Sequence, residues 1–365
     1  MTLAGFSGSY APGDVTFLLT QIQVAPMQDL QEKERLIQAG HAHYSEMLTP
    51  EQAPAPEYLA LFRSAVARHM PTMARDLLQL AGVLRQRHAR PVLVSLARAG
   101  TPVGVALRQV LASRWGMDVP HYSISILRGR GIDTVALAHL CAQYDPASLV
   151  FVDGWTGKGA ITAELCASVA AFNDAQGTQV SPDLFVLVDL AGCSAGHGSV
   201  EDYLIPSAIL NATVSGLVSR TVLNASIASD QFHGCVFYQD LRTADMSQWF
   251  VAQLRQAAAA LPAPTHADPH AQRSQRAAAA QRCSDSLQQL CDAFAVRDTH
   301  CLKVGIGETT RAMLRRAPRA LCLQRPDDAD TAHLRWLAQT RGIDVHILSS
   351  LPLKAAAVIK DLRHV

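Results

Sequence analysis

The sequence has no long apolar run, no excess of one charge and no paired-cysteine motif. Lys and Arg number 32 against 31 Asp and Glu, which gives a formal net charge of +1. This balance argues against nonspecific nucleic-acid binding by the whole chain, although a local basic patch is compatible with it. No segment approaches the roughly 18 consecutive apolar residues of a membrane helix. The eight cysteines form no C-x-x-C pair, so we expect neither a zinc ribbon nor a dithiol site.

The first residues also lack the features of a secretory signal. They carry no basic segment, and Pro12 and Asp14 stand where a signal peptide would be apolar. We therefore expect a cytoplasmic protein with reduced thiols. With 365 residues, of which 49% are hydrophobic, the chain can form a large core and a second small domain.

The most informative segment joins an apolar run to a glycine-rich loop. Residues 150–152 predict a buried strand, Asp153 follows it, and Ile161 and Leu165 have helical spacing after the loop 154–159. Free amides at such a helix start bind phosphate, and an acid at the strand end can hold a sugar hydroxyl or a metal-bound water. The spacing matches neither a Walker loop nor a dinucleotide fingerprint. An ordinary strand-to-helix turn is the alternative.

A second strand-tip loop lies upstream. Residues 91–96 predict a buried strand that ends at Arg98 beside a glycine, and a helical pattern follows. Residues 121–127 predict a third strand, followed by the basic loop 128–131, which can close over a charged substrate. Two successive anion loops imply a ligand with two phosphate groups.

This order of loops resembles the type I phosphoribosyltransferases. The resemblance implies transfer chemistry with Mg2+ held through the ligand's phosphates, and a catalytic set of Asp153, Arg98, Arg128 and Arg130. It assigns pyrophosphate to Arg98, Ala99, Gly100 and Thr101, and it assigns ribose and its 5-phosphate to Asp153, Gly154, Trp155, Thr156, Gly157, Lys158 and Gly159. The family usually has two adjacent acids, whereas here the second position is Gly154.

Longer segments narrow the resemblance. GSYAPGDVTFLL, GHAHYSEML, VDGWTGKGAI, DYLIPSAILNATVSGLVSRT and VGIGETTRAMLRR are spread over nearly the whole chain. Together they resemble the StiP family, which is associated with bacterial tellurite-resistance and stress operons. Its members are proposed to pair a phosphoribosyltransferase-like domain with a Pelota-like RNA-binding domain, and some carry the label cysteine protease.

The expected fold is α/β, with a type I phosphoribosyltransferase-like parallel sheet, an N-terminal helical extension and a small C-terminal α/β/α Pelota-like domain. The first domain spans residues 1–261 and includes a helical hood over 1–88. Residues 262–295 are poor in large apolar side chains and predict a linker. Residues 296–365 form the second domain.

The predicted RNA contact is a loop at a helix start in the second domain. It contains Gly305, Gly307, Glu308, Thr309 and Arg311, and it is similar to the recognition loop of Pelota domains. Backbone amides with an arginine and a carboxylate suit an RNA backbone and an unpaired base. Helix capping by Glu308 is an equally weighted alternative.

Two further segments carry candidates of lower rank. Cys193 in GCSAGHG precedes His197 by four residues, but a thiol and its base are normally brought together in space rather than in sequence. Residues 211–220 have helical spacing and place Asn211 and Arg220 where they can hold a second substrate. Residues 235–238 predict a strand.

The sequence therefore predicts a phosphoribosyltransferase-like enzyme that acts on phosphoribosyl pyrophosphate or a nucleotide-like metabolite and carries an RNA-binding module. One alternative is a nucleotide or phosphoribosyl sensor without turnover that docks on RNA, which the single acid before Gly154 favours. The least favoured alternative is a cysteine protease that uses Cys193.

Overall fold

The computed structural model describes residues 5–262 and 268–360, which contain one large sheet and a smaller four-stranded one. The large sheet has the order β1-β4-β3-β6-β7-β8, and its neighbours on this path are parallel, whereas β5 pairs with β4 in the antiparallel sense. Its strands are β1 (Thr16–Phe17), β3 (Val92–Ala97), β4 (His121–Leu127), β5 (Gly131–Ile132), β6 (Leu149–Thr156), β7 (Leu184–Asp189) and β8 (Gly196–Ser199). The predicted α/β architecture with a mostly parallel sheet is confirmed.

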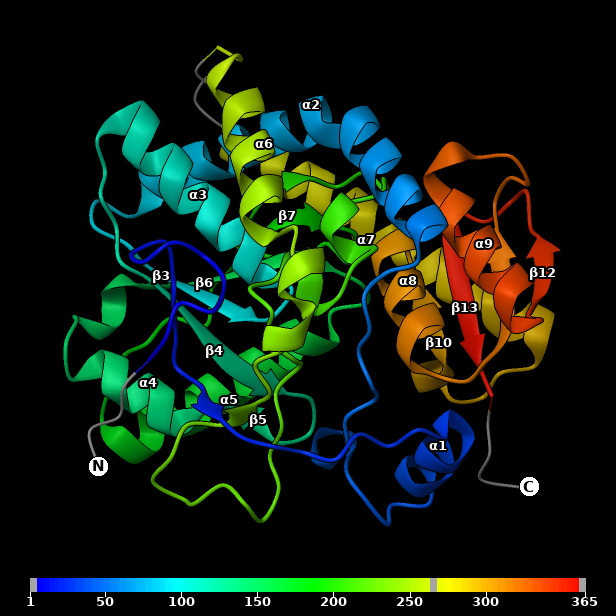
Figure 1. Ribbon diagram of the computed structural model, residues 1–365. Coiled ribbons are helices and arrows are strands. Elements are labelled where there is room, and N and C mark those ends of the chain that lie inside the picture. The colour runs from blue at the N-terminus through cyan, green and yellow to red at the C-terminus, as the bar shows by residue number, and fades with distance from the viewer. Residues whose placement is uncertain (1–4, 263–267, 361–365) are drawn as a thin grey trace.

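Helices cover both faces of this sheet (Figure 1). One core cluster joins the sheet to α2 (Pro56–Arg87), α3 (Gly100–Trp115) and α6 (Ser247–Ala259). A second cluster joins it to α4 (Thr134–Cys141) and α5 (Ala160–Gln176). Because both faces are covered, β6 and β7 are buried along their whole length, which explains their continuous apolar sequences.

Two predictions on secondary structure are wrong. Residues 211–220 do not form a helix, since only the 3₁₀ turn Ala212–Val214 forms and Gly216 and Leu217 have positive φ angles of 83° and 59°. Strand β9 contains only Gly234–Cys235, and it pairs with β2 (Thr20–Gln21) in a separate sheet. In both segments the pattern of apolar residues reflects burial in irregular chain rather than a regular element.

The C-terminal unit has a sheet in the order β10-β13-β11-β12. Its elements are β10 (Leu302–Val304), α8 (Ile306–Arg315), β11 (Pro318–Leu323), α9 (Ala332–Arg341), β12 (Asp344–Ile347) and β13 (Ala355–Ile359). Strand β13 escaped prediction because alanine, which is depleted in strands, makes up most of it.

Most of the predicted linker is helical. Helix α7 (Pro269–Phe294) fills it and buries Cys283 and Leu290. Residues 263–267 of the linker, 1–4 of the first predicted domain and 361–365 of the last lie outside the described residues.

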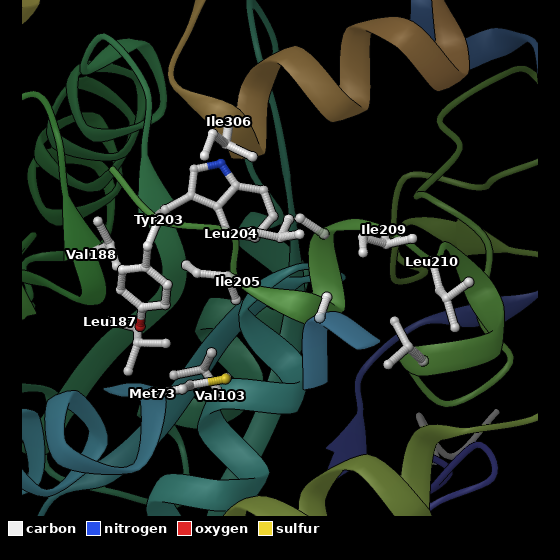
Figure 2. Packing of buried hydrophobic residues seen from close by; sticks show 14 of the residues in the cluster. Met73, Val103, Leu187, Val188, Tyr203, Leu204, Ile205, Ile209, Leu210 and Ile306 are labelled. Atoms are coloured by element: carbon white, nitrogen blue, oxygen red, sulfur yellow. The ribbon is translucent and has the colours of Figure 1, made fainter. Parts of the chain in front are cut away.

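The two units meet along an apolar contact. Ile306, at the start of α8, belongs to the same buried cluster as Leu204 and Ile205 of the N-terminal unit, and Figure 2 shows it above Leu204. Beside it, a Cβ atom on Gly307 would lie 2.6 Å from the ring of Trp155. The start of α8 is therefore pressed against the end of β6.

Within residues 5–262 and 268–360, no helix is both long enough and apolar enough to cross a membrane.

Candidate functional site: a cleft between the two units

A cleft of about 320 Å³ lies where the carboxyl ends of β3, β4 and β6 face α8. The carboxyl edge of a parallel sheet is the usual place for a ligand in such folds. The cleft is strongly cationic, because eight basic side chains and only two acidic ones line it. The basic residues are Arg98, Arg128, Lys158, Arg220, Lys303, Arg311, Arg315 and Arg316, and the acids are Asp153 and Glu308.

The predicted glycine loop forms one wall of the cleft. Strand β6 continues to Thr156, so only the second half of the predicted loop is irregular. Helix α5 then begins after Gly159, which has a φ of 81° and provides no side-chain cap for the first turn. An uncapped helix start next to Lys158 attracts an anion through its free amides and its dipole.

Asp153 lies at the bottom of the cleft. Its Oδ1 accepts a hydrogen bond of 2.7 Å from the amide of Gly154, and the residue is only 7% exposed. Burial raises the pKa of this carboxyl to about 6, although Arg311 acts in the opposite direction. Thr156, another of the seven residues predicted to contact the sugar phosphate, donates its hydroxyl to Asp189 at 2.6 Å and holds the loop.

Trp155 and Gly157 contact the C-terminal unit rather than open solvent. The indole Nε1 of Trp155 donates to Glu308 at 3.3 Å, and the guanidinium of Arg311 stacks 4.4 Å from the ring centroid. A Cβ atom on Gly157 would lie 2.4 Å from Cγ of Glu308. Burial opposes ionisation of Glu308, but Arg311 and Lys303 hold its pKa below the usual value.

Arg98 lies in the cleft wall, but its guanidinium is already engaged. It forms an ion pair of 2.6 Å with Glu51 and donates to the carbonyl of Val218 at 2.6 Å and to Asn211 at 3.1 Å. Of the other residues in its predicted loop, Ala99 also lines the cleft.

Gly100 and Thr101 are buried in the first turn of α3. The Thr101 hydroxyl shares a hydrogen bond of 2.8 Å with Ser123. Of the four residues predicted for pyrophosphate, the structure therefore brings only Arg98 and Ala99 to the cleft surface.

The basic loop predicted as a lid is anchored at several points. The amides of Gly129 and Gly131 donate to Glu164 of α5 at 2.7 and 2.8 Å. Arg130 pairs with Glu46. Arg128 reaches the cleft and contacts Nδ1 of His300 at 2.5 Å.

The predicted RNA loop is largely enclosed. Gly305, Gly307 and Thr309 are buried, so their backbones do not present an open surface. Glu308 and Arg311 line the cleft. The two predicted binding loops, one from each unit, thus lie against each other across one site.

Sequence reasoning did not find the acidic partners of the cleft. Glu51 and Glu34 approach it from the N-terminal region, where Glu34 forms bonds of 2.6 and 2.5 Å with Arg316. Glu51 lies in a segment with several prolines and no periodic pattern, so no local signal relates it to Arg98. Arg220 was named for a helix that does not form, yet it does line the cleft, and burial lowers its pKa to about 10.

Cys193 lies directly behind the glycine loop. Its Sγ shares a hydrogen bond of 3.2 Å with the hydroxyl of Thr162, a residue that lines the cleft. Burial raises the pKa of the thiol to about 11. His197 instead bonds to Gln275 through Nε2 at 3.1 Å. The thiol and the imidazole therefore have different partners here.

The described part of the chain holds no group of three or more His, Cys, Asp or Glu side chains placed to bind a metal ion.

Comparison with known proteins gives consistent matches. A family model described as "Tellurite-like stress resistance cysteine protease StiP" matches residues 8–255. A model described as "PELOTA RNA binding domain" matches residues 281–361. A relative from Acinetobacter baylyi named "Cysteine protease StiP" is 39% identical over 370 residues, which cover 98% of this chain and 95% of the relative.

These matches correct the predicted activity. The prediction of a phosphoribosyltransferase is wrong, because the matching family and the Acinetobacter relative are both described as cysteine proteases. The predictions of a transferase and of pentosyl transfer are therefore also wrong. The least favoured alternative, a cysteine protease, agrees best with the descriptions of the relatives. The predictions of the family and of a Pelota-like C-terminal domain are confirmed. The chain belongs to the StiP family and ends in a Pelota RNA-binding domain.

Proposed function

We propose that the protein is a thiol-dependent protease with Cys193 as its nucleophile. The family description and the name of the Acinetobacter relative support a protease. Attack on a peptide carbonyl requires that the thiol proton passes to a base. His197 is a candidate for that base because its buried Nδ1 has no hydrogen-bond partner among the described residues. Cys193 is chosen among the eight cysteines because it precedes this histidine by four residues.

The resting arrangement is inactive under this proposal. A thiol with a pKa of about 11 is protonated near neutral pH. Cleavage therefore requires a movement of the loop between β7 and β8 that turns Sγ from Thr162 toward the imidazole of His197. The thiolate then attacks the carbonyl carbon, and the imidazolium returns the proton to the leaving amine.

The test is cleavage of unfolded casein by the full chain and by three variants. Cys193→Ser should abolish cleavage, as should His197→Ala. Cys166→Ser is the matched control and should leave cleavage unchanged. Cys166 is an exposed thiol of α5, the helix that also carries Thr162. Cleavage that survives Cys193→Ser would assign the nucleophile elsewhere, and cleavage that survives alkylation of all thiols would contradict a thiol protease.

We propose in addition that the cleft binds an unpaired end or nucleotide of an RNA. The charge of the cleft supports this ligand, because eight basic and two acidic residues line one cavity and leave an excess of six positive charges. The match to a Pelota RNA-binding domain supplies the class of ligand. A cavity of about 320 Å³ is the size of a small-molecule site and cannot take a duplex.

The finer predictions about this ligand fit the same proposal. An RNA end presents a ribose and a 5-phosphate, so the contacts predicted for a phosphoribosyl group would be made by Asp153 and the start of α5. Asp153, together with phosphate oxygens of the ligand, would hold a magnesium ion, and the ion would supply positive charge that offsets the phosphates. A type I phosphoribosyltransferase-like sheet would then serve binding rather than transfer.

Fluorescence anisotropy with a labelled RNA stem-loop that has a 5-phosphorylated single-stranded overhang tests this proposal. Arg315→Ala should weaken binding about tenfold, the scale of one lost phosphate contact. Arg319→Ala removes the same charge from an exposed position of the same unit outside the cleft lining, and it should change binding little. Equal binding of overhang and blunt duplex would contradict the cleft as the site.

A further inference from the structure

The N-terminal segment 29–51, which we call the strap, lies beside the cleft and contributes Tyr44 to its lining. It contains α1 (Leu30–Gln38) and the 3₁₀ turn Tyr44–Glu46. In Figure 1 the blue α1 lies beside the end of the red β13, far away in sequence. The side chain of Gln38 donates to the carbonyl of Lys360 at 2.8 Å. The strap therefore contacts both units that form the cleft.

Glu51, at the end of the strap, faces three arginines of the cleft. It forms an ion pair of 2.6 Å with Arg98. Arg220 and Arg315 also lie within its electrostatic reach, and both are half-buried. Burial and the other cleft arginines lower the pKa of Arg315, while Glu51 acts in the opposite direction. One carboxylate thus serves a cluster of three guanidinium groups.

Two further strap carboxylates repeat this arrangement. Glu34 binds the guanidinium of Arg316 through both of its oxygens at 2.6 and 2.5 Å. Glu46 pairs with Arg130 of the loop beside the cleft. A guanidinium binds carboxylate and phosphate with the same two-pronged geometry. The strap consequently places carboxylate oxygens where phosphate oxygens of a ligand would lie.

The strap is also tied to the backbone of the basic loop. His43 contacts the carbonyl of Arg128 through Nε2 at 3.0 Å, and the hydroxyl of Tyr44 accepts the Arg128 amide at 2.7 Å. Arg220 donates to the carbonyls of Tyr44 and Met47. Removal of the strap would break these contacts to Arg128 and Arg220, while Glu164 would still hold the amides of Gly129 and Gly131.

We propose that the strap is an intramolecular competitor of the RNA, whose carboxylates Glu51 and Glu34 hold the cleft arginines until a phosphate-bearing ligand displaces them. This proposal rests on RNA binding in the cleft. A competing occupant lowers the apparent affinity by the fraction of molecules in which the site is open. A neutral residue in place of Glu51 or Glu34 should raise the fraction of molecules in which the site is open. Substitution of a residue that only stabilises the fold should not raise it.

The experiment measures affinity for the labelled overhang RNA in strap variants. Glu51→Gln should tighten binding roughly fivefold, and Glu34→Gln should do so less, because each removes one competing charge. The control is Glu32→Gln, since Glu32 pairs with Arg35 of its own helix at 2.7 Å and its side chain is 42% exposed. It should bind as the unmodified chain does. Thermal melting confirms that each variant is folded, and Glu34→Gln carries the test if Glu51→Gln is not.

Limited trypsin digestion gives an independent measurement. RNA should accelerate cleavage after Lys33 and Arg35 in the unmodified chain, because displacement exposes the strap. If the unmodified chain binds RNA and Glu51→Gln binds it equally well or more weakly, the proposal of a competing strap is overturned. The proposal that RNA binds in the cleft then still stands. Protection of the strap by RNA would have the same consequences, since it means closure over the ligand. No RNA binding by any variant would overturn both proposals.

Discussion

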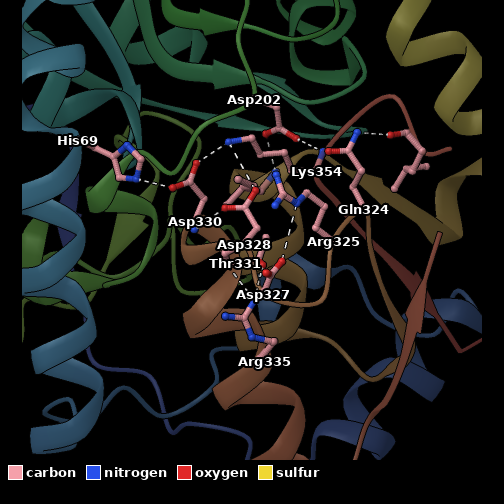
Figure 3. Close-up of polar contacts among 12 residues, drawn as sticks. His69, Asp202, Gln324, Arg325, Asp327, Asp328, Asp330, Thr331, Arg335 and Lys354 are labelled. Atoms are coloured by element: carbon pink, nitrogen blue, oxygen red, sulfur yellow. Dashed lines mark hydrogen bonds and ion pairs between the residues drawn. The ribbon is translucent and has the colours of Figure 1, made fainter. Parts of the chain in front are cut away.

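The boundary between the two units has two ends that differ in charge balance. Acidic and basic groups are matched at one end, and basic groups are in excess at the other. At one end, Asp330 contacts Nε2 of His69 at 2.8 Å and Nζ of Lys354 at 2.6 Å, while Asp202 accepts the amides of Ile306 and Lys354 at 2.9 and 2.8 Å (Figure 3). At the other end, eight basic groups face two acids in an open cleft. Matched polar groups hold the units together, and unmatched ones are available to a ligand.

The two ends also shift their carboxyl pKa values in opposite directions. Burial opposes ionisation of Asp330, yet His69 and Lys354 outweigh it and lower its pKa to about 2. Burial dominates at Asp153 and raises its pKa to about 6. A carboxyl group with a raised pKa in a cleft is typical of a functional site, and one with a lowered pKa in a filled contact is typical of structure.

Asp330→Asn should produce the largest loss, because it leaves Lys354 and His69 without their shared anion. We expect the free energy of unfolding to fall by about 3 kcal/mol, the lower end of the range for breaking a buried pair, since Lys354 is partly exposed. Urea unfolding at pH 7 measures it. Asp327→Asn is the matched control, because Asp327 and its partner Arg325 are 76% and 67% exposed. Equal losses in the two variants would contradict a structural role for the matched end.

Gly307→Ala tests the packing between the two ends. The new Cβ atom would lie 2.6 Å from the ring of Trp155, so the units must move apart. We expect a loss of about 2 kcal/mol, since overpacking outweighs the gain in helix propensity. Combination with Trp155→Leu should recover part of the loss, as a double-mutant cycle in thermal unfolding would measure. Strictly additive losses would mean that the indole is not the obstacle.

The sequence predicted four strands of the large sheet, β3, β4, β6 and β7, and missed the short strands β1, β5 and β8. The runs at 92–97 and 149–152 are apolar because both faces of the sheet are covered, and burial alone predicts such strands. The alanine strand 355–359 and the irregular segment 211–220 were missed or wrong, since their conformation depends on neighbours far along the chain. Local pattern predicts a buried segment better than it predicts its shape.

The site was predictable only in part for the same reason. Both glycine loops have the sequence of an anion site, but α5 starts at an open cleft whereas the start of α8 is pressed onto Trp155. Arg98, which the sequence predicts for pyrophosphate binding, lines the cleft, yet its partner Glu51 comes from a proline-containing segment without periodicity. Which amides and which arginines are free is decided by tertiary contacts that no spacing in the sequence encodes.

Asp153→Asn should give the smallest effect, and its sign should depend on pH. Because the folded-state pKa of Asp153 is raised to about 6 from its usual value of 3.8, the folded chain holds this proton more tightly than the unfolded chain. Its contribution to stability is complete below pH 3.8 and is lost as pH rises through 6. Asparagine carries no charge at any pH, so the variant should be more stable than the unmodified chain by about 1 kcal/mol at pH 8.

That difference should disappear at pH 4, where most of the buried carboxyl is protonated. Urea unfolding without RNA at both pH values measures it, and Asp118→Asn, at a side chain that is 84% exposed, should show no comparable change with pH. The same Asp153→Asn variant should bind RNA with magnesium more weakly than the unmodified chain. A gain in stability with a loss of binding is expected of a charge that the cleft retains for its ligand. Asp153→Asn that destabilises the chain at pH 8 would instead place Asp153 with the matched, structural end of the boundary.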